Sequence, residues 1–126
     1  MRCIAMATSD EAFFSALSPD RSRELGVAEA TRTWELYRAG VIREMSWRVD
    51  RDDVVLVLEA EDPASAEAVL GTLPLVEAGA ISFQVLGLRP YDGWQRLFAK
   101  GSAGTTDAIA DLGVSIPDRV GSRDQA

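Results

Sequence analysis

The sequence contains no histidine and only one cysteine, Cys3. A zinc site built from Cys and His ligands, a haem with an axial His, a Ser-His-Asp triad and a Cys-His nucleophile all need residues that are missing here. A single cysteine also excludes a disulfide within the chain. An acid or base in this protein must therefore be a carboxylate, a tyrosine, a lysine or the thiol.

Positive charge and long apolar runs are also scarce. The 126 residues include 20 Asp and Glu against 13 Lys and Arg, which gives a formal net charge of −7. An acidic chain disfavours nucleic acid and anionic membranes, because both require clustered cations. No apolar run approaches the roughly 20 residues of a spanning helix, and residues 1–7 lack the apolar core of a signal peptide. We expect a cytoplasmic protein that binds neither nucleic acid nor membrane.

What the chain does contain is an alternation of strand and helix patterns. Apolar residues make up 47% of it, enough for one domain with a core of its own. Ser18-Pro19 and Asp62-Pro63 are typical helix starts, and Gly40 is a typical helix end. These signals predict a short helix after residue 8, a long helix over 19–39 and a third over 63–70. Strands are predicted over 2–6, 41–49, 54–60 and 81–88.

The long helix carries two apolar rows. Val27, Ala30, Trp34, Tyr37 and Val41 recur at three- and four-residue spacing, which predicts one buried stripe. Leu25 and Leu36 lie off that stripe, so a second surface of the helix is expected to be covered too.

The element order is β-α-β-β-α-β, which is the split βαβ, ferredoxin-like plan. It predicts an α+β domain over 1–98, with an antiparallel four-stranded sheet and both main helices on one face, and a partly flexible extension over 99–126. The other sheet face must be solvated or covered by a second subunit.

Leu73-Pro74-Leu75 lies between the third helix and the last strand. Pro74 is expected to end the helix, while the two leucines fill the gap between the helix end and the sheet. A helix ending in this tripeptide, followed by a spacer, a strand and a Leu-x-Pro exit, resembles the muconolactone δ-isomerase family. The resemblance covers roughly residues 25–90 and includes the segment 35–40.

The resemblance implies a dimeric α+β barrel, in which two ferredoxin-like sheets face one another. It also implies a cofactor-free isomerase. The chain departs from the family at two places: Glu44 stands where the family has a histidine, and the family's histidine after the last strand is absent, since the chain reads Arg89-Pro90-Tyr91.

Strand alternation predicts which side chains share a face. Ile42 and Glu44 fall on one face of their strand, and Met45 falls on the other. The face with Glu44 gathers most of the polar side chains of the sheet, and a partner sheet would enclose them in a chamber. These polar side chains are Glu44, Ser46, Arg48, Glu59, Ser82 and Gln84.

We assign candidate roles on this basis. Glu44 is the first candidate acid or base and Glu59 the second, because a carboxylate among apolar walls has a raised pKa. Arg48 is placed to hold a substrate carboxylate or to stabilise an enolate. The remaining candidates for substrate binding are Arg43, Ser46, Trp34, Tyr37, Trp47 and Gln84.

Simpler interpretations stay open for the same residues. Glu44 with Arg48 is equally an ion pair at a subunit interface or part of a wet surface. Trp34, Tyr37 and Trp47 are equally core packing, and Arg43 a cap on the sheet edge.

The functional hypothesis is an isomerase that moves a proton beside the carbonyl of a lactone or other unsaturated carbonyl compound. It would use no metal and no cofactor, and it would act as a homodimer or a larger homo-oligomer. The alternatives are a non-catalytic binding or assembly protein on the same barrel, and a cofactor-free monooxygenase.

Overall fold

The computed structural model describes residues 1–99, so the predicted extension lies outside the described residues except for Ala99. The chain divides into two compact units, one over Met1–Arg89 and one that begins at Pro90. In the second unit, the described segment contains one short 3-10 helix, η1 (Gly93–Phe98). The first unit contains the sheet and all the α-helices of the described residues, and the account below concerns this unit.

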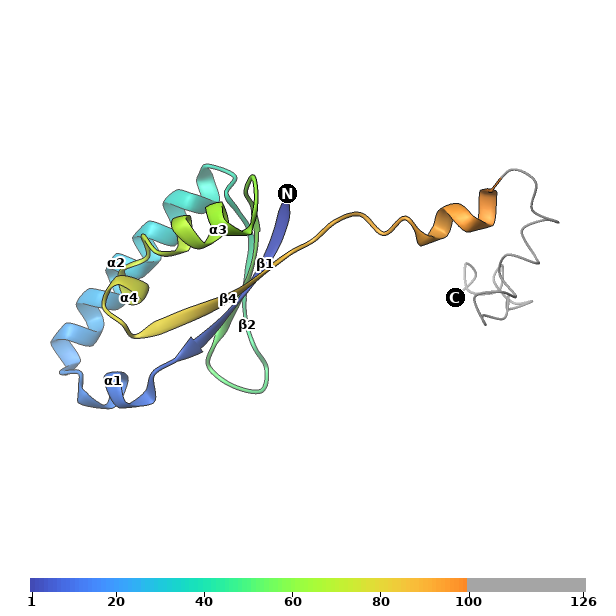
Figure 1. Ribbon diagram of the computed structural model, residues 1–126. Coiled ribbons are helices and arrows are strands. Elements are labelled where there is room, and N and C mark those ends of the chain that lie inside the picture. Colours follow the sequence, from blue (N-terminus) through green and yellow to red (C-terminus); the bar gives the residue numbers. More distant parts are fainter. Residues whose placement is uncertain (100–126) are drawn as a thin grey trace, which may run out of the picture. The chain divides into compact units, whose positions relative to one another are not determined.

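Four strands form one antiparallel sheet (Figure 1). They are β1 (Arg2–Ser9), β2 (Ile42–Trp47), β3 (Val54–Glu59) and β4 (Ile81–Gly87), in the spatial order β2-β3-β1-β4. This order, with β1 and β3 in the centre, is that of the ferredoxin-like plan predicted from the sequence. The prediction of fold class is confirmed.

The helices lie together on one side of the sheet (Figure 1). They are α1 (Glu11–Ala16), α2 (Pro19–Arg38), α3 (Pro63–Leu70) and α4 (Pro74–Glu77). The predicted caps are present, since the Ser18 side chain accepts a hydrogen bond from the Arg21 N–H at 3.1 Å. Gly40 has a φ of 79°, a left-handed conformation that favours glycine after a helix end.

The Leu-Pro-Leu tripeptide differs in part from its prediction. The helix α3 already ends at Leu70, and Pro74 begins the one-turn helix α4 rather than ending α3. A proline is favourable at a first helical position, because the missing N–H would have no partner there. Leu73 is fully buried, as expected for a side chain that fills the gap between helix and sheet.

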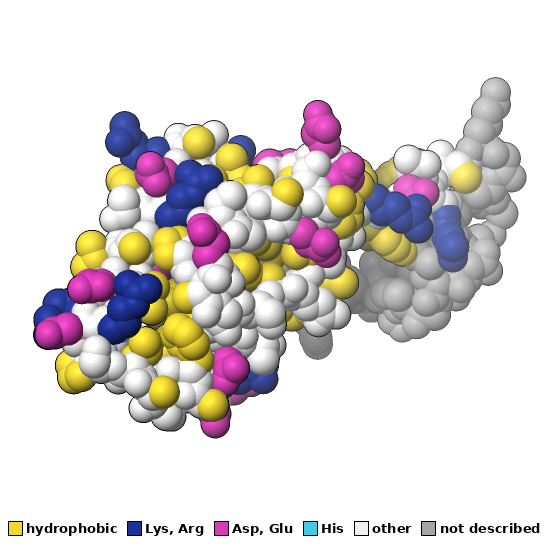
Figure 2. Space-filling model, turned by 60° about the vertical axis from the view of Figure 1, so that its left-hand side comes forward, with side chains coloured by type: hydrophobic (Ala, Val, Ile, Leu, Met, Phe, Trp, Pro, Cys, Tyr) yellow, Lys and Arg dark blue, Asp and Glu magenta, His cyan; other side chains and the backbone are white. Residues whose placement is uncertain are grey.

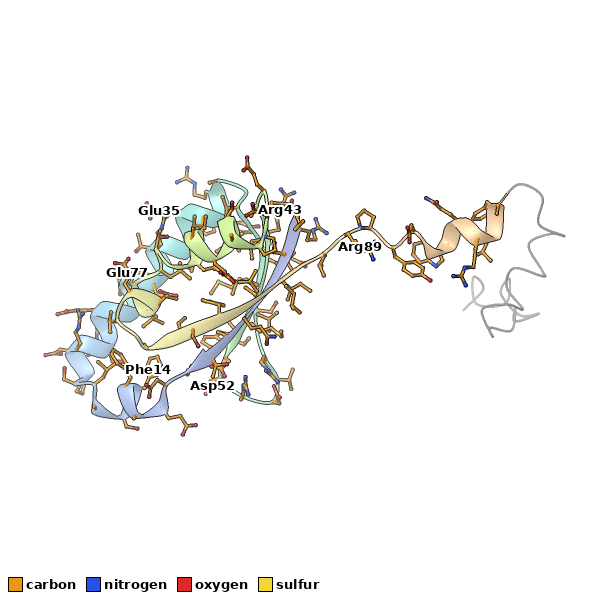
Figure 3. All side chains as sticks on the ribbon, in the orientation of Figure 1. Phe14, Glu35, Arg43, Asp52, Glu77 and Arg89 are labelled. Carbon is orange, nitrogen blue, oxygen red and sulfur yellow. The ribbon has the colours of Figure 1, made fainter. Side chains whose placement is uncertain are left out.

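The core lies between the helices and the sheet, where side chains fill the space between the two layers (Figure 3). The sheet contributes small residues from β1 and leucines from β3, and the helices contribute leucines. The buried cluster consists of Cys3, Ala5, Leu36, Ile42, Leu56, Leu58, Ala66, Leu70 and Leu73.

The buried side of α2 is not the one predicted. Val27, Trp34 and Tyr37 are 63%, 59% and 52% exposed, whereas Leu25 and Leu36 are buried. The two apolar rows have the same helical period, so periodicity alone does not decide which one faces the sheet. The choice follows from packing of Leu36 into the core cluster. The alternative that Trp34, Tyr37 and Trp47 are core residues is likewise wrong, since Trp47 is 71% exposed.

A β-bulge changes the alternation in β2. Ile42 pairs with Leu58 but Glu44 pairs with Val57, so Arg43 is the additional residue. Ile42 therefore lies on the helix-covered face, 1% exposed, and the prediction that it shares a face with Glu44 is wrong. Beyond the bulge the prediction holds, because Met45 pairs with the buried Leu56.

The orientation of α2 is testable by paired truncations. Leu36→Ala removes a buried side chain and is expected to lower the free energy of unfolding by about 2–5 kcal/mol. Val27→Ala, in the predicted but exposed row, is expected to change it by less than about 0.5 kcal/mol. Urea denaturation followed by circular dichroism measures both. Equal losses for the two variants would contradict this orientation.

Candidate functional site

A cavity of about 320 Å³ lies between α2 and the sheet. Its size is at the lower end of the roughly 300–1,000 Å³ range of small-molecule sites. The helices α2 and α4 and all four strands contribute to its lining, which is mostly apolar. The lining residues are Ala7, Gly26, Glu29, Ala30, Thr33, Met45, Trp47, Val54, Leu75 and Ile81.

One side of α2 forms the helical wall of this cavity. Gly26, Glu29, Ala30 and Thr33 follow the spacing i, i+3, i+4 and i+7, which places them in one row along the helix. Gly26 and Ala30 have almost no side chain, so the helix leaves room above the sheet at these positions. Glu29 provides the carboxylate of the row.

Glu29 is half-buried and its side chain is held by a hydrogen bond from α4. Its Oε1 accepts a hydrogen bond from the backbone N–H of Leu75 at 3.0 Å, which ties α2 to α4. Burial raises the pKa of Glu29, because desolvation disfavours the charged carboxylate, and the Leu75 hydrogen bond opposes this shift. A carboxylate with a raised pKa can accept a proton and return it.

Thr33 lies in the same wall, and the residue is 9% exposed. Its hydroxyl group is the second polar side-chain group of the wall. It donates to the backbone carbonyl oxygens of Glu29 at 3.0 Å and Ala30 at 3.1 Å. This back-bonding satisfies the hydroxyl inside the helix, so Thr33 contributes shape to the cavity rather than a free donor.

An aromatic groove adjoins the cavity. The Trp34 and Tyr37 rings stack at 5.5 Å between centroids with an angle of 22°. They line a hollow of about 280 Å³ that shares Ala30, Thr33 and Met45 with the cavity. Figure 2, with the helix side brought forward, shows hydrophobic side chains exposed between the charged ones. Trp47 lines the cavity itself, so the three predicted aromatic residues lie around one site, and their role in binding stays a prediction.

The polar candidates lie elsewhere. Glu44 and Ser46 are exposed on the sheet face opposite the helices, on the edge strand β2, and Gln84 lies on the other edge strand, β4. Two strands separate them, and at about 4.8 Å per strand the edges are roughly 14 Å apart. The structure therefore does not bring Gln84 together with Glu44 in one protomer.

Two of the other charged candidates, Arg48 and Glu59, are already paired. The Arg48 guanidinium donates to both carboxylate oxygens of Asp50 at 2.8 and 2.7 Å and holds the pKa of Asp50 below its usual range. Glu59 lies 3.4 Å from Arg2 and 3.6 Å from the N-terminal amine. Arg43 is exposed at the bulge, and Figure 3 shows it and Asp52 at opposite ends of the β2–β3 hairpin. Catalysis by Glu44 or Glu59 stays a prediction.

Sequence reasoning missed Glu29, Thr33 and Gly26. The available signal was the spacing of Leu25, Glu29 and Thr33 at four-residue intervals, with Leu36 three residues further. If this row is the buried one, a glutamate in its middle indicates a functional residue, because an unpaired carboxylate is costly at a buried position.

Comparisons with known proteins support the fold and leave the activity open. The crystal structure of muconolactone isomerase matches with a TM-score of 0.59 and 20% sequence identity, over 73% of this chain and 92% of that one. No family model matches the chain, and no curated protein matches it either. The shared α+β fold is therefore shown by structure alone. Among the described residues, no helix is long and apolar enough to cross a membrane.

The burial of Glu29 predicts a pH-dependent effect of Glu29→Gln on stability. Because its pKa is higher in the folded state, the folded protein loses stability as the pH rises above the ordinary value of 4.5 towards the raised one. Glutamine keeps the acceptor for the Leu75 N–H but carries no charge. We expect Glu29→Gln to raise the melting temperature at pH 8 and to have a smaller effect at pH 4, measured by differential scanning calorimetry.

The control is Glu67→Gln at an exposed position of α3. It is expected to leave the melting temperature almost unchanged at both pH values. A loss of stability in Glu29→Gln at pH 8 would contradict the desolvation of this carboxylate.

Proposed function

We propose that this protein is a cofactor-free proton-transfer enzyme of the isomerase type, with Glu29 as its acid and base. The observation that carries the proposal is a half-buried carboxylate in an otherwise apolar cavity of small-molecule size. The fold that the chain shares with muconolactone isomerase supports the same class of reaction. The proposal replaces Glu44 by Glu29 as the first candidate.

The reaction that suits one carboxylate is a 1,3-proton shift. The Glu29 carboxylate takes a proton from the carbon between a carbonyl group and a C=C bond, and the electron pair left behind delocalises into a dienolate. The carboxylic acid then returns the proton to the far carbon of the former double bond. The double bond moves into conjugation with the carbonyl, and the enzyme ends in its initial protonation state.

The sheet face opposite the helices supports a homodimer. Its central part consists of half-buried apolar residues from β1 and β3, namely Ile4, Met6, Val55 and Val57. Polar side chains of the edge strands, such as Glu44 and Gln84, surround this apolar centre. A second copy of the same sheet would cover it. The polar residues would then lie in the interface, in the enclosed chamber that the sequence analysis predicts.

The dimer is testable by one charge placed in the centre of this face. Val57→Lys is expected to shift the protein from dimer to monomer, because an uncompensated ammonium group would be buried in the interface. Light scattering after size-exclusion chromatography at micromolar concentration measures the mass. Ala28→Lys, on the exposed side of α2, is the control and is expected to remain dimeric. A wild-type monomer would contradict the dimer.

Catalysis is testable by comparing the two carboxylates. Unsaturated γ-lactones are screened for thermal stabilisation, and each hit is incubated in D2O and followed by NMR for double-bond movement and deuterium uptake. Glu29→Gln is expected to lose about 10²–10⁴-fold in rate, the usual contribution of a general base. Glu67→Gln, at an exposed position, is the control and shows whether the preparation of a variant by itself changes the rate.

Each result of this comparison is informative. A larger loss in Glu44→Gln than in Glu29→Gln would place the reaction on the opposite sheet face. Stabilisation of the wild type by a lactone without any turnover would favour the second candidate function, a binding protein. That candidate is supported by the stacked Trp34 and Tyr37 rings, which offer an aromatic surface in a groove that no carboxylate lines.

A further inference from the structure

The cavity has an unbalanced charge. Among its described lining residues, Glu29 is the one ionisable group, and the nearby Arg32 does not compensate it. The Arg32 guanidinium instead donates to the Thr72 hydroxyl at 3.1 and 3.0 Å and lies 3.9 Å from Glu35. A ligand carboxylate in this cavity would meet a like charge and no cation, and both charges would be poorly solvated.

Two of the donors in the cavity wall are also occupied. The Leu75 N–H donates to Glu29, and the Thr33 hydroxyl donates to the backbone carbonyls of its own helix. Neither group is free to bind a carboxylate or a developing enolate oxygen. The Trp47 indole N–H is a neutral donor in the same lining, so a substrate that delocalises the negative charge over its own conjugated system suits this cavity better than a carboxylate.

Gly26 explains the shape of the cavity. A glycine inside a helix costs about 1 kcal/mol relative to alanine. Gly26 is not among the described residues with positive φ, and a Cβ built on it would have no neighbouring atom within 4 Å. Neither backbone conformation nor close packing therefore requires a glycine here. What the glycine provides is open space beside the cavity that it lines.

We infer that the cavity selects an uncharged, compact unsaturated carbonyl compound over a carboxylate anion of the same shape, and that Gly26 sets the size of ligand admitted. The inference rests on the proposed function for the class of compound. It differs from the sequence-based expectation that Arg48 holds a substrate carboxylate, because Arg48 is paired with Asp50 and does not line the cavity.

Charge selection is tested with two ligands of matched shape. One is a γ-lactone with a C=C bond in its ring and an acetate side chain, and the other is the methyl ester of the same compound. Isothermal titration calorimetry at pH 8 with the full-length protein is expected to give at least about tenfold tighter binding of the ester. In Glu29→Gln the ratio is expected to fall towards one, because the acid gains affinity when the like charge is removed.

The outcomes separate this inference from the proposed function. Equal or tighter binding of the acid by the wild type overturns charge selection, even if the lactone is turned over. Preferential binding of the ester without turnover supports charge selection and contradicts the isomerase. If neither compound binds at millimolar concentration, charge selection is overturned as well.

The role of Gly26 is tested by Gly26→Ala and Gly26→Leu. Alanine is expected to raise the melting temperature by a few degrees, because helix propensity improves, while the affinity for the ester falls. Leucine is expected to reduce that affinity at least about tenfold. The control is Ala28→Leu, on the same helix but outside the cavity lining. Unchanged ester binding by Gly26→Leu would overturn the assignment of Gly26.

Discussion

The packing of α2 on the sheet is the constraint on which the site depends. Leu36 packs into the core cluster together with the leucines of β3 and the small residues of β1. This contact fixes the rotation of the helix about its axis. The rotation in turn directs the row from Gly26 to Thr33 towards the space above the sheet. Because that row combines small side chains with one carboxylate, the packing leaves a cavity with an acid in its wall.

The two faces of the sheet differ in the side chains that they carry and in what covers them. The helix-covered face is apolar, and the cavity beside it contains the carboxylate of Glu29, whose pKa is raised by burial. The opposite face has an apolar centre and polar edges. Of its two glutamates, Glu59 forms an ion pair with Arg2 and Glu44 is exposed to solvent. Burial on the helix side distinguishes Glu29 as a functional candidate from Glu44, which is exposed, and from Glu59, which pairs with Arg2 and the N-terminal amine.

The likeness to muconolactone isomerase concerns the fold and leaves the site open. At 20% identity the two chains share an arrangement of strands and helices. Many different sequences can maintain one fold, provided that hydrophobic residues of suitable total volume fill its core. An active site depends on a few side chains at particular positions, and such positions change without loss of the fold. The residues that line the cavity of this chain are therefore the basis for its proposed function.

The sequence by itself determined the element order and the helix caps, because these follow from local rules of spacing and capping. It also excluded histidine chemistry outright. Only the tertiary structure decided which of two equally periodic rows on α2 is buried, and that a bulge at Arg43 returns Ile42 to the core. Both outcomes depend on contacts between segments far apart in the chain. Glu29 became a candidate for the same reason, since its desolvation comes from elements that the fold brings around it.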